Sequence, residues 1–335
     1  MNQAMNKQRT KIGVFGAGHL GKIHIRCLQQ SDEYELVGFF DADTANAAKV
    51  SADLGLTAFA TADALLAVVD VADIVTPTFA HFAVAKTALT QGKHVFIEKP
   101  VTKTVAEADE LLAIATKNDL CVAVGHVERF NPAFLAIQNE QVAPRFVEGH
   151  RLSTFNPRGT DVSVVLDLMI HDLDIILHLI KSKVKTVQAN GVAIVSPTAD
   201  IANARIEFEN GAVANLTASR ISMKQMRKIR LFQADAYISL DFLDKKAEIV
   251  RLYNENQAET MNKDVLMPLP TQNGTKYIGM TLPEPPAVNA ILTELNEFAK
   301  AIKNKTAPIV TLQNGRDALA LALEIDKQCL ASLQT

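Results

Sequence analysis

A glycine-rich turn near the start of the chain constrains its fold more than any other feature. The apolar run Lys11-Ile12-Gly13-Val14-Phe15 leads into Gly-x-Gly-x-x-Gly, spelled Gly16-Ala17-Gly18-His19-Leu20-Gly21. The first glycine permits a tight turn, the second lets the backbone approach a ligand, and the third lets the next helix pack close to the strand. The pattern therefore predicts a strand, a turn and a helix whose amino end binds a pyrophosphate. The turn residues predicted to bind the cofactor are Gly16, Gly18, His19, Leu20 and Gly21.

The residues that follow the turn supply the context of a dinucleotide site. The run Glu35-Leu36-Val37-Gly38-Phe39-Phe40 predicts the next strand, and Asp41 follows it, 20 residues after Gly21. An acid at this place binds the adenosine ribose hydroxyls and repels a 2′-phosphate, so we expect NAD rather than NADP. The alternative is a structural glycine turn, with Asp41 capping a helix that begins near Thr44.

Length and composition favour a soluble protein of about two domains. The chain has 335 residues, is 48% hydrophobic and 21% charged, and carries a net charge of −3, which disfavours nucleic acid as a partner. Cys27, Cys121 and Cys329 lie far apart with no C-x-x-C pattern. That spacing argues against a disulfide framework or zinc site and suits a reducing compartment. Residues 1–10 are polar, and no run reaches the roughly 18 apolar residues of a membrane span, so we expect a cytoplasmic protein with no membrane partner.

Residues 11–125 alternate between strand-like and helix-like segments, which predicts a doubly wound parallel sheet of the Rossmann type. Such a sheet binds ligands at the carboxyl ends of its strands. The expected strands are 11–15, 35–40, 72–75, 94–97 and 121–124, and the expected helices are 19–30, 43–53, 61–69, 79–91 and 103–117.

Residues 126–335 predict a second, α/β domain with a mostly antiparallel sheet, because strands follow one another without intervening helices. Asn210-Gly211 predicts a hairpin, and residues 254–286 are expected to be irregular. The last two helices are able to pack back on the first domain. The expected helices are Val162 to about Leu179, 287–304 and 314–332, and the expected strands are 184–195, 200–208, 212–219, 226–234, 236–241 and 246–251.

A charged pair ends the predicted strand 94–97 as Glu98-Lys99-Pro100. Because ligands bind at the carboxyl ends of such strands, we expect Glu98 and Lys99 at the cofactor and Lys99 also at the substrate. The alternative is a solvated ion pair. Thr76, Pro77 and Thr78 follow the strand 72–75 and are expected beside the cofactor, unless they form an ordinary strand-to-helix turn.

His81 is expected to face the same crevice, unless it simply occupies the first turn of its helix. Arg129 and Asn131 are predicted to bind an oxygen-rich substrate, with an interdomain ion pair and a helix N-cap before Pro132 as the alternatives. Arg158 is predicted to bind phosphate, as Arg151 could, and a structural ion pair is the alternative for each.

The run Asp167-Leu168-Met169-Ile170-His171 lies in a helical pattern, where residues four apart share a face. Histidine accepts a proton near neutral pH, so the predicted catalytic residues are Lys99, Asp167 and His171. The alternatives are a surface Asp–His pair or a metal site formed by His171, Asp174 and His178. We expect no metal, because no cysteine nearby offers a further ligand.

From Lys11 to the last helix the chain resembles the glucose–fructose oxidoreductase/inositol dehydrogenase (Gfo/Idh/MocA) family. Its glycine turn, Glu98-Lys99-Pro100 and Asp167-x-x-x-His171 carry the resemblance. The resemblance implies a Rossmann domain (11–125), then a substrate-binding and oligomerisation domain (126–335) with an open, mostly antiparallel sheet. That sheet is the expected subunit interface of a homodimer or homotetramer. The resemblance also implies NAD(P)-dependent oxidation or reduction of a sugar or cyclitol, with Lys99, Asp167 and His171 in the active site.

Within the family, residues 125–132 and 167–172 resemble those of UDP-N-acetylglucosamine 3-dehydrogenases. This resemblance implies hydride transfer between nicotinamide and the 3-position of a nucleotide sugar. The alternatives are a dehydrogenase of a free sugar or cyclitol, a double-bond reductase, and a dinucleotide-binding regulator without catalytic turnover.

Overall fold

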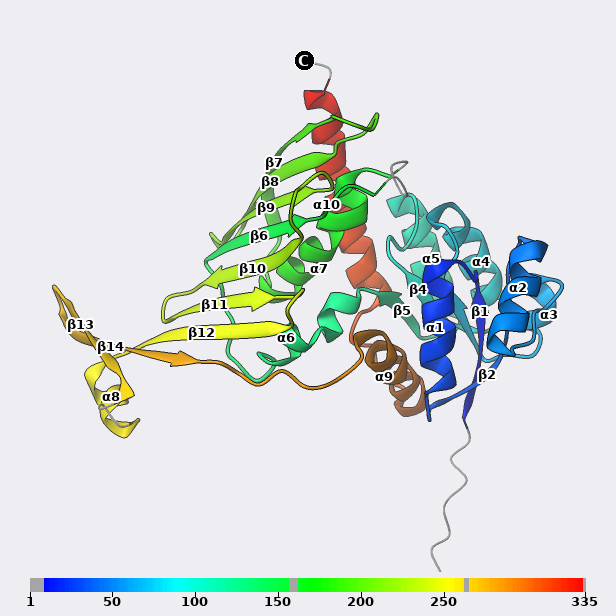
Figure 1. Cartoon of the computed structure of the whole chain (residues 1–335), viewed down its shortest axis with the longest axis horizontal. Coiled ribbons are helices and arrows are strands. Elements are labelled where there is room, and N and C mark those ends of the chain that lie inside the picture. The colour runs from blue at the N-terminus through cyan, green and yellow to red at the C-terminus, as the bar shows by residue number, and fades with distance from the viewer. Residues whose placement is uncertain (1–8, 157–161, 262–264, 334–335) are drawn as a thin grey trace, which may run out of the picture. The chain divides into compact units, whose positions relative to one another are not determined.

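Two compact units make up the chain, and each is described by itself. The structure is a computed structural model that describes residues 9–156, 162–261 and 265–333 (Figure 1). Unit 1 comprises Met1–Phe130 and Val288–Ala320, and unit 2 comprises Asn131–Ala287 and Leu321–Thr335. The last helix therefore begins in unit 1 and ends in unit 2.

Unit 1 is built on a five-stranded parallel sheet in the order β2-β1-β3-β4-β5. Its strands are β1 (Thr10–Phe15), β2 (Tyr34–Phe40), β3 (Val71–Ile74), β4 (His94–Glu98) and β5 (Val122–Gly125). Its helices are α1 (His19–Gln29), α2 (Thr44–Leu54), α3 (Ala62–Leu66), α4 (Thr78–Thr90), α5 (Val105–Lys117), the 3-10 helix η1 (Val127–Phe130), α9 (Ala290–Asn304) and the start of α10 (Leu312–Ser332).

Apolar side chains on both faces of the strands explain this sheet. Ile12, Val14 and Phe96 are fully buried, and they join a core that Phe298 of α9 completes. Helix α1 packs against α9, and α4 packs against α5. Because all five strands are parallel, the glycine turn, the loop after β3 and the Glu98-Lys99-Pro100 segment all lie at the same edge of the sheet.

Unit 2 is built on a nine-stranded sheet in the order β13-β14-β12-β11-β10-β6-β9-β8-β7 (Figure 1). Every neighbouring pair is antiparallel except β6 and β9. Its strands are β6 (Phe146–Leu152), β7 (Val184–Val192), β8 (Ile201–Phe208), β9 (Val213–Ser219), β10 (Met226–Phe232), β11 (Ala236–Asp241), β12 (Lys246–Tyr253), β13 (Met267–Thr271) and β14 (Gly274–Thr281). Its helices are α6 (Pro132–Leu135), the π-helix η2 (Val165–Met169), α7 (Ile170–Leu179), α8 (Glu255–Thr260) and the end of α10.

Helix α7 and the end of α10 lie against this sheet (Figure 1). Burial alternates along β8, so one set of its side chains is buried and the other is not. Gln328 of α10 ties the helix to β7, since it accepts from the Ala189 N–H at 2.9 Å and donates to the Val187 carbonyl at 3.2 Å. The predicted α/β class, a Rossmann sheet followed by a mostly antiparallel sheet, is confirmed.

The structure corrects three details of the sequence analysis. Residues 254–286 are not wholly irregular, because they contain α8, β13 and β14. Strand β6 was not predicted, since Gly149 and Arg151 occupy two of its three buried positions. The helix expected from Val162 begins instead with the π-turn η2, after a β-branched stretch that disfavours an α-helix. The hairpin at Asn210-Gly211 is confirmed, with Gly211 at φ +82°.

Candidate active site

Two of the three glycines in the turn are required by close packing. Gly16 has φ +96°, and a Cβ there would lie 2.7 Å from the Val75 carbonyl oxygen. A Cβ on Gly21 would collide with the carbonyl oxygen of Gly16. By contrast, a Cβ on Gly18 would meet no described atom within 4 Å. The middle glycine therefore faces open space, where a ligand can approach the backbone.

The amino end of α1 has the properties of an anion site. Gly18 is the N-cap residue, and no side chain in the described parts of the chain caps this end. Gly18 and His19 are exposed, whereas Leu20 is half-buried. Exposed N–H groups and the positive end of the helix dipole fit the pyrophosphate of a dinucleotide.

Asp41 connects the end of β2 to the glycine turn. Its Oδ2 accepts from the Ala17 N–H at 2.7 Å and from Asn46 Nδ2 at 3.1 Å, and its Oδ1 accepts from the Asp43 N–H at 2.9 Å. A carboxylate has about four acceptor positions, so these three contacts leave one for a ribose hydroxyl. Asp43, and not Asp41, caps α2.

The loop after β3 lies against the glycine turn, since Gly16 approaches Val75 and Thr76 so closely. Pro77 is the N-cap residue of α4, and Thr78 begins that helix. Thr76 Oγ1 is buried and has no hydrogen-bond partner among the described residues. An unsatisfied buried hydroxyl beside the glycine turn fits a polar ligand such as the dinucleotide.

His81 ties this loop to the segment that follows β4. Its Nε2 lies 2.8 Å from the Thr76 carbonyl oxygen, and its Nδ1 lies 2.9 Å from the Pro100 carbonyl oxygen. Burial lowers the pKa of His81, so the ring is neutral near pH 7 and donates to one carbonyl at a time. His81 therefore positions two loops at the edge of the sheet where the cofactor is expected.

Glu98 and Lys99 also lie at this edge of the sheet. The residues packed beneath them, His24 and Asp73, were not predicted from the sequence. Glu98 is buried, and its Oε2 accepts from the Lys99 N–H at 3.1 Å. Its Oε1 lies 3.3 Å from Nε2 of His24, whose Nδ1 lies 3.0 Å from Asp73 Oδ2. The signal in the sequence was Asp73 itself, an acid within an apolar strand, because a buried charge requires a partner.

Asp167 and His171 lie on consecutive helical segments of unit 2. Asp167 is in the π-turn η2, His171 is the second residue of α7, and both side chains are half-buried. π-turns are frequent at functional sites. Lys99 belongs to unit 1, so the meeting of these three residues stays a prediction.

The remaining substrate-binding predictions have different outcomes. Arg129 is buried in η1, and the structure leaves its role in substrate binding untested. Asn131 caps α6 by accepting from the Ala133 N–H at 3.0 Å, and its amide donates to the Phe242 carbonyl at 3.0 Å. This cap is the alternative that the sequence analysis left open. Arg158 lies outside the described residues.

Arg151 forms a buried ion pair, which was also one of two alternatives. Its Nε and Nη2 lie 3.0 and 2.7 Å from Asp172 Oδ1. Asp174 is buried, whereas His178 is exposed on the same helix. In the described ranges, no three histidine, cysteine or acidic side chains are grouped as metal ligands.

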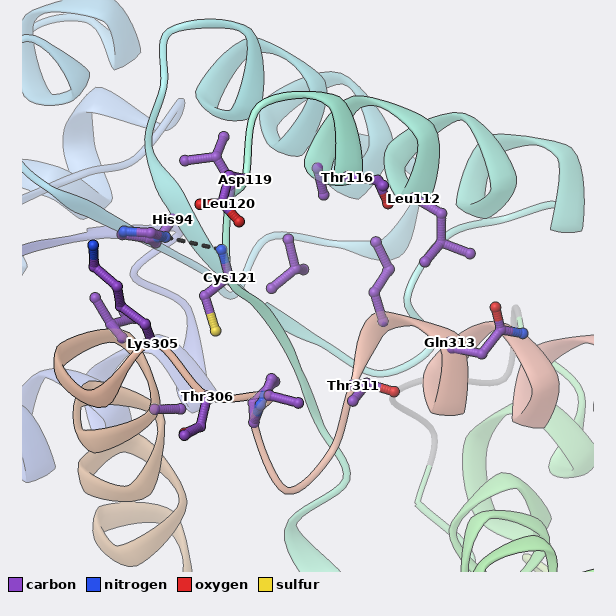
Figure 2. Close-up of a pocket in the computed structure, with 17 residues that line it drawn as sticks. His94, Leu112, Thr116, Asp119, Leu120, Cys121, Lys305, Thr306, Thr311 and Gln313 are labelled. Atoms are coloured by element: carbon purple, nitrogen blue, oxygen red, sulfur yellow. Dashed lines mark hydrogen bonds between the residues drawn. The ribbon is translucent and has the colours of Figure 1, made fainter.

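A cavity of about 670 Å³ lies at the opposite edge of the parallel sheet (Figure 2). It is lined by His94, the first residue of β4, by Cys121 just before β5, and by Lys305 after α9. The Cys121 N–H donates to His94 Nδ1 at 2.9 Å, and burial raises the pKa of the Cys121 thiol to about 11. Because the amino ends of β4 and β5 form this cavity, it is separate from the glycine turn.

Comparison with known proteins identifies the family. A family model described as an oxidoreductase family with an NAD-binding Rossmann fold matches residues 10–126, and a GFO/IDH/MocA C-terminal domain model matches residues 138–238. The chain belongs to the Gfo/Idh/MocA oxidoreductase family. The resemblance stated from the sequence is thereby confirmed, and the chain is an oxidoreductase.

Individual relatives support the same conclusion. The chain is 38% identical to a UDP-N-acetylglucosamine 3-dehydrogenase of Acidithiobacillus ferrooxidans, over 97% of this chain and 98% of that protein. A solved structure under the same name and organism has a TM-score of 0.86, with 37% identity, and covers 98% of this chain and 100% of that one. A myo-inositol 2-dehydrogenase of Thermotoga maritima is 24% identical, over 95% of both chains. No helix in the described ranges is both long and apolar enough to cross a membrane.

Proposed function

We propose that this oxidoreductase transfers a hydride between NAD and the 3-position of UDP-N-acetylglucosamine or a closely related nucleotide sugar. The observation that carries the proposal is 38% identity, along almost the whole chain, to a protein named for that reaction. The inositol dehydrogenase relative is only 24% identical. A free cyclitol is therefore the comparison substrate.

The residues after β2 support NAD over NADP. Asp41 and Asp43 place two carboxylates within three residues, and the segment 41–48 contains no lysine or arginine. A 2′-phosphate would be repelled there and would find no cation in that segment. The glycine turn would hold the pyrophosphate, and Asp41 would accept from a ribose hydroxyl.

The reaction requires a proton and a hydride to leave the same CH–OH group. Bound NAD supplies the hydride acceptor. His171 accepts the hydroxyl proton, and the ammonium of Lys99 stabilises the negative charge that develops on that oxygen. Asp167 orients His171 or holds Lys99. This mechanism needs the three side chains to share one substrate.

Several predicted residues have supporting roles in the proposal. Arg129 and Arg158 are proposed to bind the phosphates or sugar oxygens of the nucleotide sugar, Arg158 on sequence alone. Asn131 is proposed to help bind the substrate through the segment that it caps. His81 positions the loops on which Thr76 and Lys99 lie.

The substrate is tested by incubating the protein with NAD or NADP and each of three sugars. UDP-N-acetylglucosamine with NAD should give the largest rise in NADH absorbance, ahead of free N-acetylglucosamine and myo-inositol. Mass spectrometry should find a nucleotide sugar that has lost two hydrogens, and NMR should place the new carbonyl at C3. A larger kcat/KM for myo-inositol would refute the proposed substrate.

The catalytic roles are tested by Lys99→Ala and His171→Ala. Each should lower the single-turnover rate of NAD reduction by about 10²–10⁴-fold. Lys103→Ala and His178→Ala are matched controls, because Lys103 is an exposed lysine near Lys99 and His178 is an exposed histidine on the helix of His171. Near-wild-type rates in Lys99→Ala and His171→Ala would remove the assignment.

We also infer that the protein is a cytoplasmic homodimer or homotetramer. Its three cysteines are free thiols, which suits a reducing compartment. Met267, Leu269 and Met280 are exposed on β13 and β14, and such apolar surface is typical of subunit contacts. Light scattering coupled to size-exclusion chromatography should give two or four times the 36.4 kDa of one chain.

A further inference from the structure

A buried histidine bridges two acids beneath the Glu98-Lys99-Pro100 segment. His24 of α1 and Asp73 of β3 are fully buried, and Glu98 at the end of β4 is 7% exposed. His24 Nδ1 lies 3.0 Å from Asp73 Oδ2, and its Nε2 lies 3.3 Å from Glu98 Oε1. We call these three residues the His24 network. Nδ1 is hydrogen-bonded to Asp73, whereas the contact of Nε2 with Glu98 is an ion-pair distance without a hydrogen bond among the described residues. A doubly protonated ring carries the positive charge that attracts both acids.

The charges around the ring support the imidazolium form. Burial by itself lowers the pKa of His24, but Asp73 and Glu98 together raise it well above its ordinary value. Burial likewise opposes the charge on Glu98, yet His24 and Lys99 hold its pKa below the usual range. Cys27 on α1 lies within the electrostatic reach of His24 and Asp73, and burial raises the pKa of its thiol, so the thiol stays neutral.

The remaining neighbour on β2 is neutral as well. Tyr34 lies within the electrostatic reach of Asp73, and burial raises the pKa of its phenol well above the ordinary value. Burial also raises the pKa of Asp73, although His24 opposes that rise. The group therefore pairs two acids, Asp73 and Glu98, with two basic residues, His24 and Lys99. This balance accounts for the presence of so much charge in the core of a dinucleotide-binding unit.

The Glu98 carboxylate has close neighbours on three sides. His24 contacts Oε1, and the Lys99 N–H donates to Oε2 at 3.1 Å. On the β5 side the residue is Gly125, where a Cβ would lie 2.7 Å from Oε1. The orientation of this carboxylate therefore sets the backbone at Lys99, the residue from which the proposed catalytic ammonium projects.

We propose that His24, as an imidazolium between Asp73 and Glu98, is a positioning residue for Lys99. It fixes the Glu98 carboxylate, and that carboxylate fixes the backbone from which the Lys99 side chain extends. The inference rests on the proposed function, in which Lys99 contacts the reacting hydroxyl. The competing explanation is that the network only ties α1 to the sheet. That explanation predicts a loss of stability without a specific loss of turnover.

The kinetic test compares His24→Gln with the wild-type enzyme. We expect kcat to fall by about tenfold or more, because a small displacement of a catalytic group is costly, while KM for NAD and for the nucleotide sugar changes by less than about threefold. His94→Gln is the matched control, because His94 lies at the opposite end of β4 and also hydrogen-bonds within the unit. It should retain kcat within about twofold. Unchanged kcat in His24→Gln would overturn the proposal.

Glu98→Gln keeps the test decisive if His24→Gln does not fold. This substitution removes the negative charge that pairs with His24 but leaves an oxygen that can accept a hydrogen bond from the Lys99 N–H. It should show the same fall in kcat with little change in KM. A folded Glu98→Gln enzyme with wild-type kcat would overturn the proposal.

Two measurements test the role of the His24 network without relying on catalytic turnover. In histidine labelled with ¹⁵N, the His24 signal, assigned by its absence in His24→Gln, should show two protonated ring nitrogens at pH 7. Hydrogen exchange at the Lys99 amide should become about tenfold faster or more in His24→Gln than in the wild-type protein or in His94→Gln. A neutral His24 ring, or unchanged exchange at Lys99, would overturn the inference. If the wild-type protein reduces no NAD with any sugar, the proposed function fails, while these two results still decide whether His24 positions Lys99.

Discussion

The buried ion pair between Arg151 and Asp172 gives a quantitative test of how unit 2 holds helix α7. Arg151 lies on β6, and Asp172 follows His171 on α7. The Arg151 and Asp172 side chains are 3% and 4% exposed, with Nη2 and Oδ1 2.7 Å apart. The pair therefore fixes the rotation of α7 about its axis, and with it the direction of the proposed catalytic imidazole.

Removing one partner leaves the other charge buried, which costs about 3–5 kcal/mol. Asp172→Ala should lower the free energy of unfolding by that amount. For a urea slope of roughly 3 kcal/mol/M, the midpoint of unfolding should fall by about 1–2 M. Arg151→Met/Asp172→Leu removes both charges and should recover most of the loss, because neither charge then has to be buried in the core.

The assay is urea unfolding followed by tyrosine fluorescence, since the chain has no tryptophan and three of its four tyrosines lie in unit 2. Glu148→Ala is the control on the same strand. It breaks the Arg230–Glu148 ion pair, whose side chains are each 37% exposed, and such a pair contributes less than about 1 kcal/mol. If Asp172→Ala costs no more than Glu148→Ala, the pair is not buried in solution.

Three further predictions concern the glycine turn, cofactor choice and acid stability. Gly21→Ala should destabilise unit 1 by about 1–3 kcal/mol in urea unfolding, because the added methyl meets the Gly16 carbonyl. Gly18→Ala (φ −66°) should fold normally but bind NADH more weakly in a fluorescence titration, since its methyl fills the open ligand side. Asp41→Ser should reduce the preference for NAD over NADP in kcat/KM by about tenfold, or about 1.4 kcal/mol, and an unchanged ratio would dismiss the repulsion argument. Asp200 accepts hydrogen bonds from three backbone N–H groups and from the Ser196 side chain. Burial opposes its negative charge, but these hydrogen bonds lower its pKa to about 2. Its stabilisation should be complete above about pH 4 and be lost as the pH falls towards 2, so Asp200→Asn should flatten the fall of Tm across that range.

The parallel sheet of unit 1 was predictable because its signals are local. Its strands are short runs rich in apolar residues, and the helices after β2 and β4 begin with side-chain caps. The second strand was expected at 35–40 and is Tyr34–Phe40, and the helix after the fourth begins with a capping box at Thr104 and Glu107. Parallel strands joined by helices then fix which edge binds the ligand.

Strands were missed in unit 2 where the sequence pattern carries a contrary signal. In β6 the three buried positions are Val147, Gly149 and Arg151, so apolar alternation is absent. In β13 two prolines argue against a central strand, and the structure places β13 at the edge of the sheet, where proline is tolerated. Strand β6 depends on a partner that is distant in sequence, Asp172 of α7, whereas β13 pairs with β14, the strand that directly follows it.

The same reasoning explains why the His24 network escaped the sequence analysis and how such a network could be found. Asp73 lies in a four-residue strand whose every position is buried, so it requires a cation from another element. Helix α1 is the first helix after the glycine turn, and of its buried residues only His24 can carry a positive charge. The second acid was already singled out as Glu98, though only for its place beside Lys99. An acid inside a buried strand next to the nucleotide edge should therefore be paired first with the polar residues on the buried face of the preceding helix. In this chain that search leads from Asp73 through His24 to Lys99.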